Sequence, residues 1–151
     1  MTSPLTGSSP LQQPDASLMQ GLARTRRGGS AWQRGMAAEE AACSALRRDG
    51  WTILLRRART PCGEIDIVAE RLEPGTEALL AFVEVKARPI LSQAAASVSA
   101  RQQKRLLGAG QILLGRHPEW THGCIRFDVL LVDAAGVVRR ITDAFRQQNP
   151  S

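Results

Sequence analysis

Cysteine, lysine and long apolar runs are all scarce in this chain of 151 residues. The three cysteines, Cys43, Cys62 and Cys124, form no Cys-x-x-Cys pair. This spacing argues against a disulfide scaffold or a zinc ribbon and fits a reducing compartment. No apolar run reaches membrane-spanning length, and the N-terminus lacks the apolar core of a signal peptide. We therefore expect a cytoplasmic protein that has no membrane partner.

Lysine is much rarer than arginine. The chain has 20 basic residues, and only Lys86 and Lys104 are lysine. An ammonium group can hold a water or a reacting oxygen, and its pKa shifts more readily than that of a guanidinium. A lysine in so arginine-rich a chain can therefore mark a chemical role. The net charge of +6 indicates a polyanionic partner, and a basic surface that only aids solubility is the alternative.

Length and composition fit one domain with two tails. We expect a disordered, basic-ended tail over residues 1–30, a folded domain over 31–146 and a frayed end over 147–151. Hydrophobic periodicity predicts helices and strands in the order helix, three strands, helix, two strands. The helices cover about 33–49 and 94–116, and the strands cover 51–55, 63–69, 79–86, 125–132 and about 137–141. This order predicts an α/β domain with a mixed sheet flanked by helices.

The second and third predicted strands carry charges where a structural strand would be apolar. The turn signal Glu73-Pro74-Gly75-Thr76 joins them into an antiparallel hairpin. If the hairpin folds about the glycine, Asp66 faces Glu84, and Glu64 faces Lys86. Glu84 and Lys86 then project from the same face of the sheet. Because opposed like charges are destabilising, the two facing carboxylates require a cation, and the pattern predicts a metal site beside a lysine.

Hard divalent ions such as Mg²⁺ or Mn²⁺ match this donor set. They prefer carboxylate, carbonyl and water oxygens, which Asp66, Glu84 and the Val85 carbonyl would supply. Such an ion polarises a phosphoryl oxygen and lowers the pKa of its bound water. Lys86 would orient or deprotonate that water, or stabilise the charge that gathers on the phosphorus. The matching substrate is a phosphodiester in DNA or RNA.

Two further polar residues lie on apolar helix faces. Glu39 lies within the apolar stripe of the first helix, where an unpaired carboxylate would cost several kcal/mol. It therefore either bridges to an arginine or points at the same site as Asp66 and Glu84. Gln102 lies on the core side of the second helix, although core helices also carry glutamines whose hydrogen bonds are satisfied.

Basic residues gather after the first strand, after the third strand and along the second helix. They predict contacts with the phosphates of a nucleic acid. The residues are Arg56, Arg57, Arg59, Arg88, Arg101, Lys104 and Arg105.

Several blocks of the sequence resemble the YraN-like family of uncharacterised bacterial proteins. The matching blocks are Gly35 with Glu39, Gly63-Glu64-Ile65-Asp66, the run Phe82-Val83-Glu84-Val85-Lys86-Ala87-Arg88, and Arg126-Phe127-Asp128 with Ala144-Phe145. The resemblance spans about residues 33–146. That family is similar to the archaeal Holliday-junction resolvases and to the restriction-endonuclease-like PD-(D/E)xK nucleases, which implies a single domain of that fold.

The resemblance implies roles for individual residues. Asp66 and Glu84 would be metal ligands, Lys86 the catalytic lysine, and Glu39 the helix acid that completes the site. Glu64 belongs to the motif, and facing Lys86 would make it a partner that positions the lysine.

Two positions depart from the family pattern. Arg57 stands where the family usually has Asn, and Gln102 stands where the second helix usually carries a lysine, with Lys104 two residues on. Some related nucleases use Gln at this position of the helix. Both departures affect the positioning of DNA more than the binding of metal.

Two functions follow from this sequence. The first is a metal-dependent nuclease that cuts DNA, branched or single-stranded, in repair, recombination or DNA uptake. The second is a binding module that keeps the fold and the basic surface but does not cleave. A homodimer is a further implication of the resemblance, because a four-way junction offers two symmetric strands.

Overall fold

The structure, a computed structural model, describes residues 26–72, 74–75, 77–92, 96–120 and 122–142. The chain divides into two compact units, Met1–Gln33 and Arg34–Ser151. Of the first unit, only residues 26–33 are described, and these are helical. The sheet and both hollows described below belong to the second unit.

The second unit contains one five-stranded sheet in which the strands lie side by side in chain order. Neighbouring strands are antiparallel except β3 and β4, which are parallel and are connected through a helix. The elements are α2 (Arg26–Arg48), β1 (Thr52–Thr60), β2 (Gly63–Arg71), β3 (Leu79–Ala87), α3 (Ala100–Arg116), β4 (Cys124–Val132) and β5 (Val138–Ile141). The predicted mixed α/β fold and the predicted order α-β-β-β-α-β-β are confirmed.

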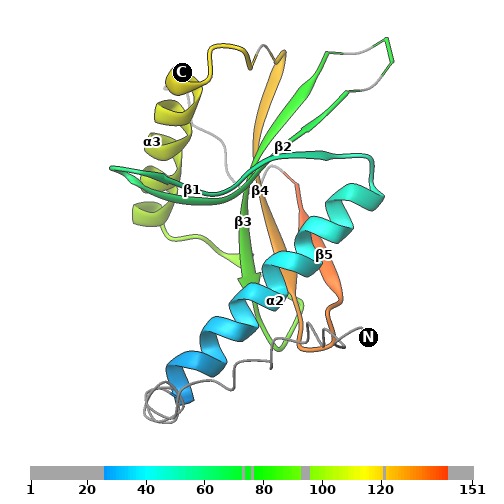
Figure 1. Cartoon of the computed structure of the whole chain (residues 1–151), viewed down its shortest axis with the longest axis vertical. Coiled ribbons are helices and arrows are strands. Elements are labelled where there is room, and N and C mark those ends of the chain that lie inside the picture. The colour runs from blue at the N-terminus through cyan, green and yellow to red at the C-terminus, as the bar shows by residue number, and fades with distance from the viewer. Residues whose placement is uncertain (1–25, 73, 76, 93–95, 121, 143–151) are drawn as a thin grey trace, which may run out of the picture. The chain divides into compact units, whose positions relative to one another are not determined.

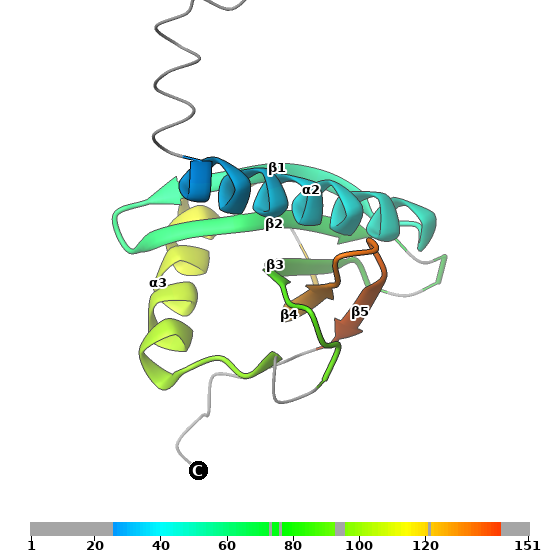
Figure 2. The ribbon, with the colours of Figure 1, turned by 90° about the horizontal axis from the view of Figure 1, so that it is seen from below.

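The helices α2 and α3 cover opposite faces of the sheet (Figures 1 and 2). On one face Leu46 of α2 packs in a cluster with Val83 of β3. On the other face Leu106 of α3 packs in a cluster with Phe82 of β3. Because side chains alternate along a strand, Glu84 and Lys86 project on the α3 face with Phe82, and the predicted common face of these two charges is confirmed.

The element boundaries differ from the predicted ones at three places. The helix α2 begins at Arg26 instead of about 33, so its start overlaps the predicted 1–30 tail. The strand β1 continues to Thr60 instead of ending at 55, and α3 begins at Ala100 instead of 94. Glycines and a run of arginines suggested loops, but helix and strand propensities are weak and are overridden by packing. Residues 1–25 and 143–151 lie outside the described residues, so the predicted domain limits stay predictions.

The hairpin of β1 and β2 is irregular near its middle. The register shifts between Ile53 and Leu55, and Arg57 has a φ of 50°, which a residue with a side chain rarely adopts. On the opposite strand, Ile67 packs in the α2-side cluster, whereas Ile65 packs in the α3-side cluster. Strict alternation would put both isoleucines on one face. The intervening residue, Asp66, therefore lies where the strand changes faces.

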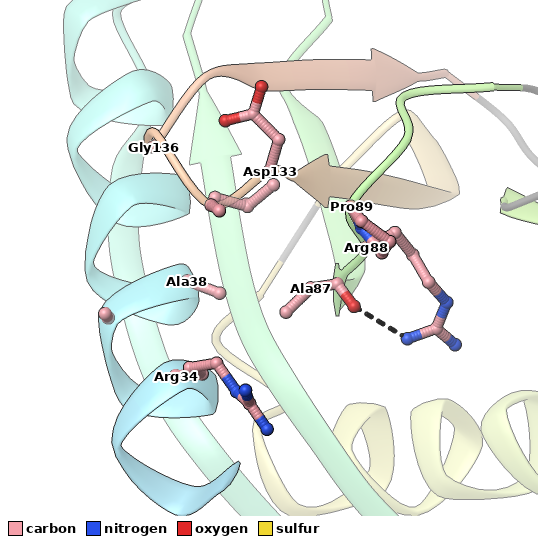
Figure 3. Close-up of a pocket in the computed structure, with 10 residues that line it drawn as sticks. Arg34, Ala38, Ala87, Arg88, Pro89, Asp133 and Gly136 are labelled. Carbon is pink, nitrogen blue, oxygen red and sulfur yellow. Dashed lines mark hydrogen bonds between the residues drawn. The ribbon is translucent and has the colours of Figure 1, made fainter. Parts of the chain in front are cut away.

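Two hollows open on the surface of this unit. One, of about 470 Å³, lies beside α2 where β3 and β4 end (Figure 3). The other is a groove of about 1210 Å³ along α3. None of the described helices combines the length and the hydropathy needed to cross a bilayer.

Candidate metal centre

Asp66 and Val85 meet where β2 and β3 separate. The two strands pair from Arg71–Leu79 to Ile67–Val83, in the register predicted for a hairpin centred on Gly75. Beyond Ile67 the Asp66 Oδ2 accepts a hydrogen bond from the Val85 N–H at 2.7 Å. The carboxylate thus replaces a backbone partner in the ladder, and this contact fixes it against β3.

Neither predicted facing pair is a backbone pair of the sheet, although the side chains of Asp66 and Glu84 are in contact. The backbone pairing ends before Asp66 could face Glu84, and before Glu64 could face Lys86. Glu64 instead forms an ion pair with Arg59 of the neighbouring strand at 3.6 Å. The reason is that β2 leaves β3 beyond Ile67 but stays paired with β1, where Arg59 is the partner of Glu64. Glu64 therefore does not position the lysine by facing it.

Asp66 and Glu84 nevertheless lie close together and perturb each other. Burial raises the pKa of Glu84 to about 7, and the charge of Asp66 raises it as well, while Lys86 and Arg105 act in the opposite direction. Burial also raises the pKa of Asp66, against the lowering effect of the Val85 N–H. A hydrogen bond between the two carboxyl groups raises the pKa of Glu84 and lowers that of Asp66. Two half-buried acids in contact, each with its pKa raised by burial, make a site that favours a cation.

Gln102 connects α3 to this pair. Its Nε2 donates to Glu84 Oε1 at 3.0 Å. The residue lies in the first turn of α3, where Ser99 caps the helix by accepting from the Gln102 N–H. The predicted position of this polar residue on the sheet side of its helix is confirmed. It orients one carboxylate oxygen without neutralising the charge, because an amide carries none.

Lys86 lies next to Glu84 on the α3 face and is buried, with 8% of the residue exposed. Its Nζ donates to the Ser97 carbonyl oxygen at 2.6 Å. Burial lowers the pKa of Lys86, the charge of Arg88 lowers it as well, and Glu84 opposes both effects. The ammonium is thus held at one known acceptor and loses its proton more readily than a free lysine.

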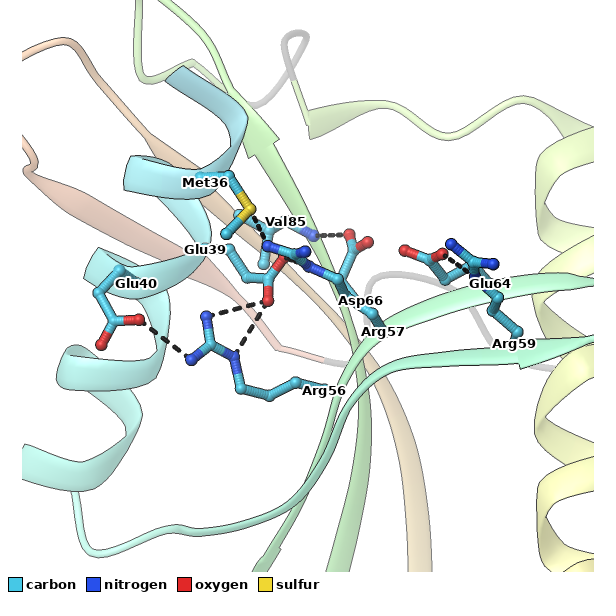
Figure 4. Close-up of polar contacts among 9 residues, drawn as sticks. All are labelled: Met36, Glu39, Glu40, Arg56, Arg57, Arg59, Glu64, Asp66 and Val85. Carbon is cyan, nitrogen blue, oxygen red and sulfur yellow. Dashed lines mark hydrogen bonds and ion pairs between the residues drawn. The ribbon is translucent and has the colours of Figure 1, made fainter. Parts of the chain in front are cut away.

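Glu39 forms the predicted bridge to arginine and also lies close to Asp66. Its carboxylate bridges to the Nε atoms of Arg56 and Arg57 at 3.0 and 3.1 Å (Figure 4). A guanidinium nitrogen of Arg57 also contacts the Met36 sulfur. The bridge to arginine is therefore real. Glu39 also lies near enough to Asp66 that its charge raises the pKa of that carboxyl.

The residues present fit a Mg²⁺ or Mn²⁺ ion with few protein ligands. The N–H and C=O of one strand residue point to the same side, so the Val85 carbonyl faces the gap that Asp66 enters. With Asp66 and Glu84 it makes the predicted set of three oxygens. Among the described residues, no cluster of three or more His, Cys, Asp or Glu side chains fits a metal. Mg²⁺ usually takes only one or two carboxylates and completes its shell with water and phosphate oxygens.

The structure separates the predicted nucleic-acid residues into two groups. Arg101, Lys104 and Arg105 line the groove along α3 together with Gln102. The others lie elsewhere: Arg56 and Arg57 bind Glu39, Arg59 binds Glu64, and the exposed Arg88 donates to the Ala87 carbonyl. The groove along α3 therefore reaches the carboxylates through Gln102.

The motif glycine Gly63 and the Ser97 carbonyl were not singled out in the sequence. Gly63 has a φ of 141°, and a Cβ there would lie 2.9 Å from the Arg105 side chain. A side chain at this position would displace Arg105 from the edge of the groove. The glycine of the Gly-Glu-Ile-Asp block was the available signal, whereas a backbone carbonyl leaves none in a sequence.

Comparison with known proteins identifies the family. The model of the uncharacterised protein family UPF0102 matches residues 38–132. A UPF0102 protein of Granulibacter bethesdensis is 55% identical over 120 residues, which cover 80% of this chain and 73% of the relative. UPF0102 proteins of Rhodopseudomonas palustris and Bradyrhizobium diazoefficiens are each 44% identical over 116 residues, 77% of this chain and 85% and 84% of the relatives. The matched region contains all of the candidate metal centre, and the chain belongs to the UPF0102 family.

Proposed function

We propose that this protein is a metal-dependent nuclease that hydrolyses phosphodiester bonds in DNA. The observation that carries the proposal is the adjacent Asp66 and Glu84 pair. Burial raises the pKa of both half-buried carboxyl groups, and the charge of Asp66 raises that of Glu84 further. Among the described residues, no arginine or lysine forms an ion pair with either one. A structural pair of this kind would be costly, whereas a divalent ion would offset the repulsion.

Each residue of the centre has a role in such a reaction. Asp66, Glu84 and the Val85 carbonyl would hold Mg²⁺ or Mn²⁺. When bound, the ion would polarise a phosphoryl oxygen and lower the pKa of a water. Lys86, held by the Ser97 carbonyl, would orient the attacking water or stabilise the charge that develops on the phosphate. Its lowered pKa suits it to take a proton from that water.

The groove along α3 supplies a binding surface for the DNA backbone. Three cations, Arg101, Lys104 and Arg105, line it, and all three are exposed. Gln102, in the same turn of the helix, binds Glu84. A phosphate in this groove would therefore lie beside the turn of α3 that also positions a metal ligand. Because phosphate contacts are electrostatic, the affinity would fall steeply with salt.

A non-cleaving DNA-binding module is the second candidate, and the pairing of Glu39 favours it. Two arginines already neutralise the Glu39 carboxylate, which lies close to Asp66. Glu39 would therefore have to lose these arginines before it could help to bind an ion. In this alternative the groove along α3 keeps its affinity for DNA, and the centre binds no divalent ion.

Cleavage assays with the two lysines of the chain separate these candidates. Single-stranded, duplex, flap and four-way DNA would be incubated with purified protein and Mg²⁺ or Mn²⁺. We expect Lys86→Ala to slow cutting at least 100-fold, the order of a lost proton-transfer group, with DNA affinity nearly unchanged. Lys104→Ala is the matched control: it should weaken binding several-fold and leave the rate at saturating DNA unchanged.

Two outcomes of these assays would contradict the nuclease proposal. Equal cutting by wild type and Lys86→Ala would assign the activity to another site or to a contaminant. DNA binding without cutting of any substrate, together with no divalent ion bound in calorimetry, would establish the binding module instead.

A further inference from the structure

The hollow beside α2 has an apolar floor. Ala37 and Ala38 of α2 form one side, and Ala87 and Val132 lie at the ends of β3 and β4 (Figure 3). Ala38 and Val132 are buried, while Pro89 lines the remaining side. The volume of about 470 Å³ falls within the range of roughly 300–1,000 Å³ that small-ligand sites occupy.

Positive charge borders this floor. Arg34 and Arg88 both line the hollow, and both are exposed. Figure 3 shows their side chains extending toward the same side of it. Arg34 has no hydrogen-bond or ion-pair partner within the described part of the chain, and Arg88 donates only from Nη1, to the Ala87 carbonyl. Most of the guanidinium donors are thus available to an anion.

Asp133, an acid that lines the hollow, offsets only part of this charge. Asp133 Oδ1 accepts hydrogen bonds from the N–H groups of Ala135 and Val137, each at 2.9 Å. The carboxylate is therefore held within the turn between β4 and β5. An apolar floor with two guanidinium groups at its border suits a flat aromatic group joined to a phosphate.

We propose that this hollow binds the unpaired base of a single-stranded stretch of DNA, with Arg34 and Arg88 on the adjoining phosphates. The inference rests on the proposed function, because it needs a chain that binds DNA. Ala87 directly follows Lys86 at the end of β3, and the two side chains point to opposite faces of the sheet. A strand that enters the hollow would therefore pass around the end of β3 to reach the candidate lysine. A duplex keeps its bases stacked and cannot fill the hollow. The strand that binds in the hollow is therefore unpaired there.

Fluorescence anisotropy without divalent ions tests this inference apart from catalysis. Three probes of 12 nucleotides would be compared: oligothymidine, a backbone with abasic units throughout, and a blunt duplex. Ala37→Leu narrows the hollow without changing charge, and it replaces an exposed helix residue by another good helix former. We expect it to weaken oligothymidine binding about tenfold, which corresponds to a loss of about 1.4 kcal/mol of apolar contact with one base. Binding of the abasic backbone and the duplex should change less than twofold.

Charge variants provide the matched controls. Arg34→Gln and Arg88→Gln should each weaken both single-stranded probes about three- to tenfold. Arg48→Gln removes the same charge from the far end of α2, about 20 Å away along the helix, and should have less than a twofold effect. Thermal melting would confirm that every variant is folded. Should Ala37→Leu fail to fold, ultraviolet crosslinking of a 5-iodouracil oligonucleotide to wild type should label peptides that line the hollow.

Failure of this inference is distinct from failure of the nuclease proposal. Equal loss by Ala37→Leu for oligothymidine and the abasic backbone, or crosslinks only to the groove along α3, would overturn the base-binding hollow while leaving cleavage possible. Base-dependent binding that Ala37→Leu removes, without cutting of any DNA, would support the hollow and reject the nuclease.

Discussion

Two clusters of buried acid in the same sheet differ in how their charge is neutralised. Asp128 of β4 has no exposed side-chain surface and lies 3.1 Å from Arg126 and 2.9 Å from Arg140. Both guanidinium groups lie over the ring of Trp51, at 5.4 and 4.8 Å from its centroid. We call this cluster closed, because the acid is neutralised by two arginines that are themselves largely buried.

The Asp66–Glu84 pair is built in the opposite way. Its polar partners are a backbone N–H and an amide, neither of which carries a charge, and the pKa of Glu84 rises to about 7. The comparison shows that burial of an acid does not identify a functional site. Among the described residues no guanidinium forms an ion pair with Asp66 or Glu84, so in the proposed function an external cation would neutralise this pair.

The largest expected effect comes from breaking the closed cluster. Asp128→Ala leaves Arg126 and Arg140 largely buried without their carboxylate and should lower the free energy of unfolding by about 3–5 kcal/mol. Urea denaturation measures this loss. Binding of Mg²⁺ at temperatures where the variant is folded should stay at the wild-type level. A loss below about 1 kcal/mol would show that the cluster is not a structural ion pair.

Glu84→Gln tests the Asp66–Glu84 pair, which we call the open pair. At alkaline pH this substitution should raise the free energy of unfolding, whereas Asp128→Ala should lower it. The pKa of Glu84 is about 7 in the folded state, above the usual 4.5. The folded protein therefore loses stability as pH rises from about 4.5 through 7. Gln mimics the protonated acid, so at pH 8 the variant should be more stable than wild type by about 1–3 kcal/mol. The two proteins should converge near pH 4.

Calorimetry on the same variant completes this test. Glu84→Gln should no longer bind Mg²⁺ or Mn²⁺, whereas wild type should. A variant that is less stable than wild type at pH 8 would mean that Glu84 is a structural acid like Asp128.

The smallest change in the free energy of unfolding is expected for Glu39. Its environment is intermediate between that of Asp128 and that of the Asp66–Glu84 pair. Its side chain is about as buried as a core residue, but its partners Arg56 and Arg57 keep about a third of their side-chain surface exposed. Glu39→Gln should therefore cost about 1 kcal/mol in thermal or urea unfolding. Glu40→Gln, which removes an exposed contact with the same Arg56, is the control and should cost less than about 0.5 kcal/mol. Stabilisation by Glu39→Gln would instead assign Glu39 to the open pair.

Much of the fold could be predicted because the signals are local. Alternation in Leu79–Ala87 and the turn around Gly75 were enough for the hairpin, its register near the turn and the common face of Glu84 and Lys86. The separation of β2 from β3 at Asp66 could not be predicted. It accompanies a φ of 50° at Arg57, and an arginine gives no signal for a left-handed conformation.

The candidate site shows the same division. The acids and the lysine were recognisable as charges within apolar strands, and the sequence by itself determined that these charges exist and which face two of them share. Only the tertiary structure decided that Glu39 is bridged to arginines 17 and 18 residues away, that Lys86 binds the Ser97 carbonyl, and that Glu84 has only an amide donor from α3. The physical reason is that neutralisation depends on distances of a few ångströms between distant segments, and those distances follow from how the helices pack on the sheet.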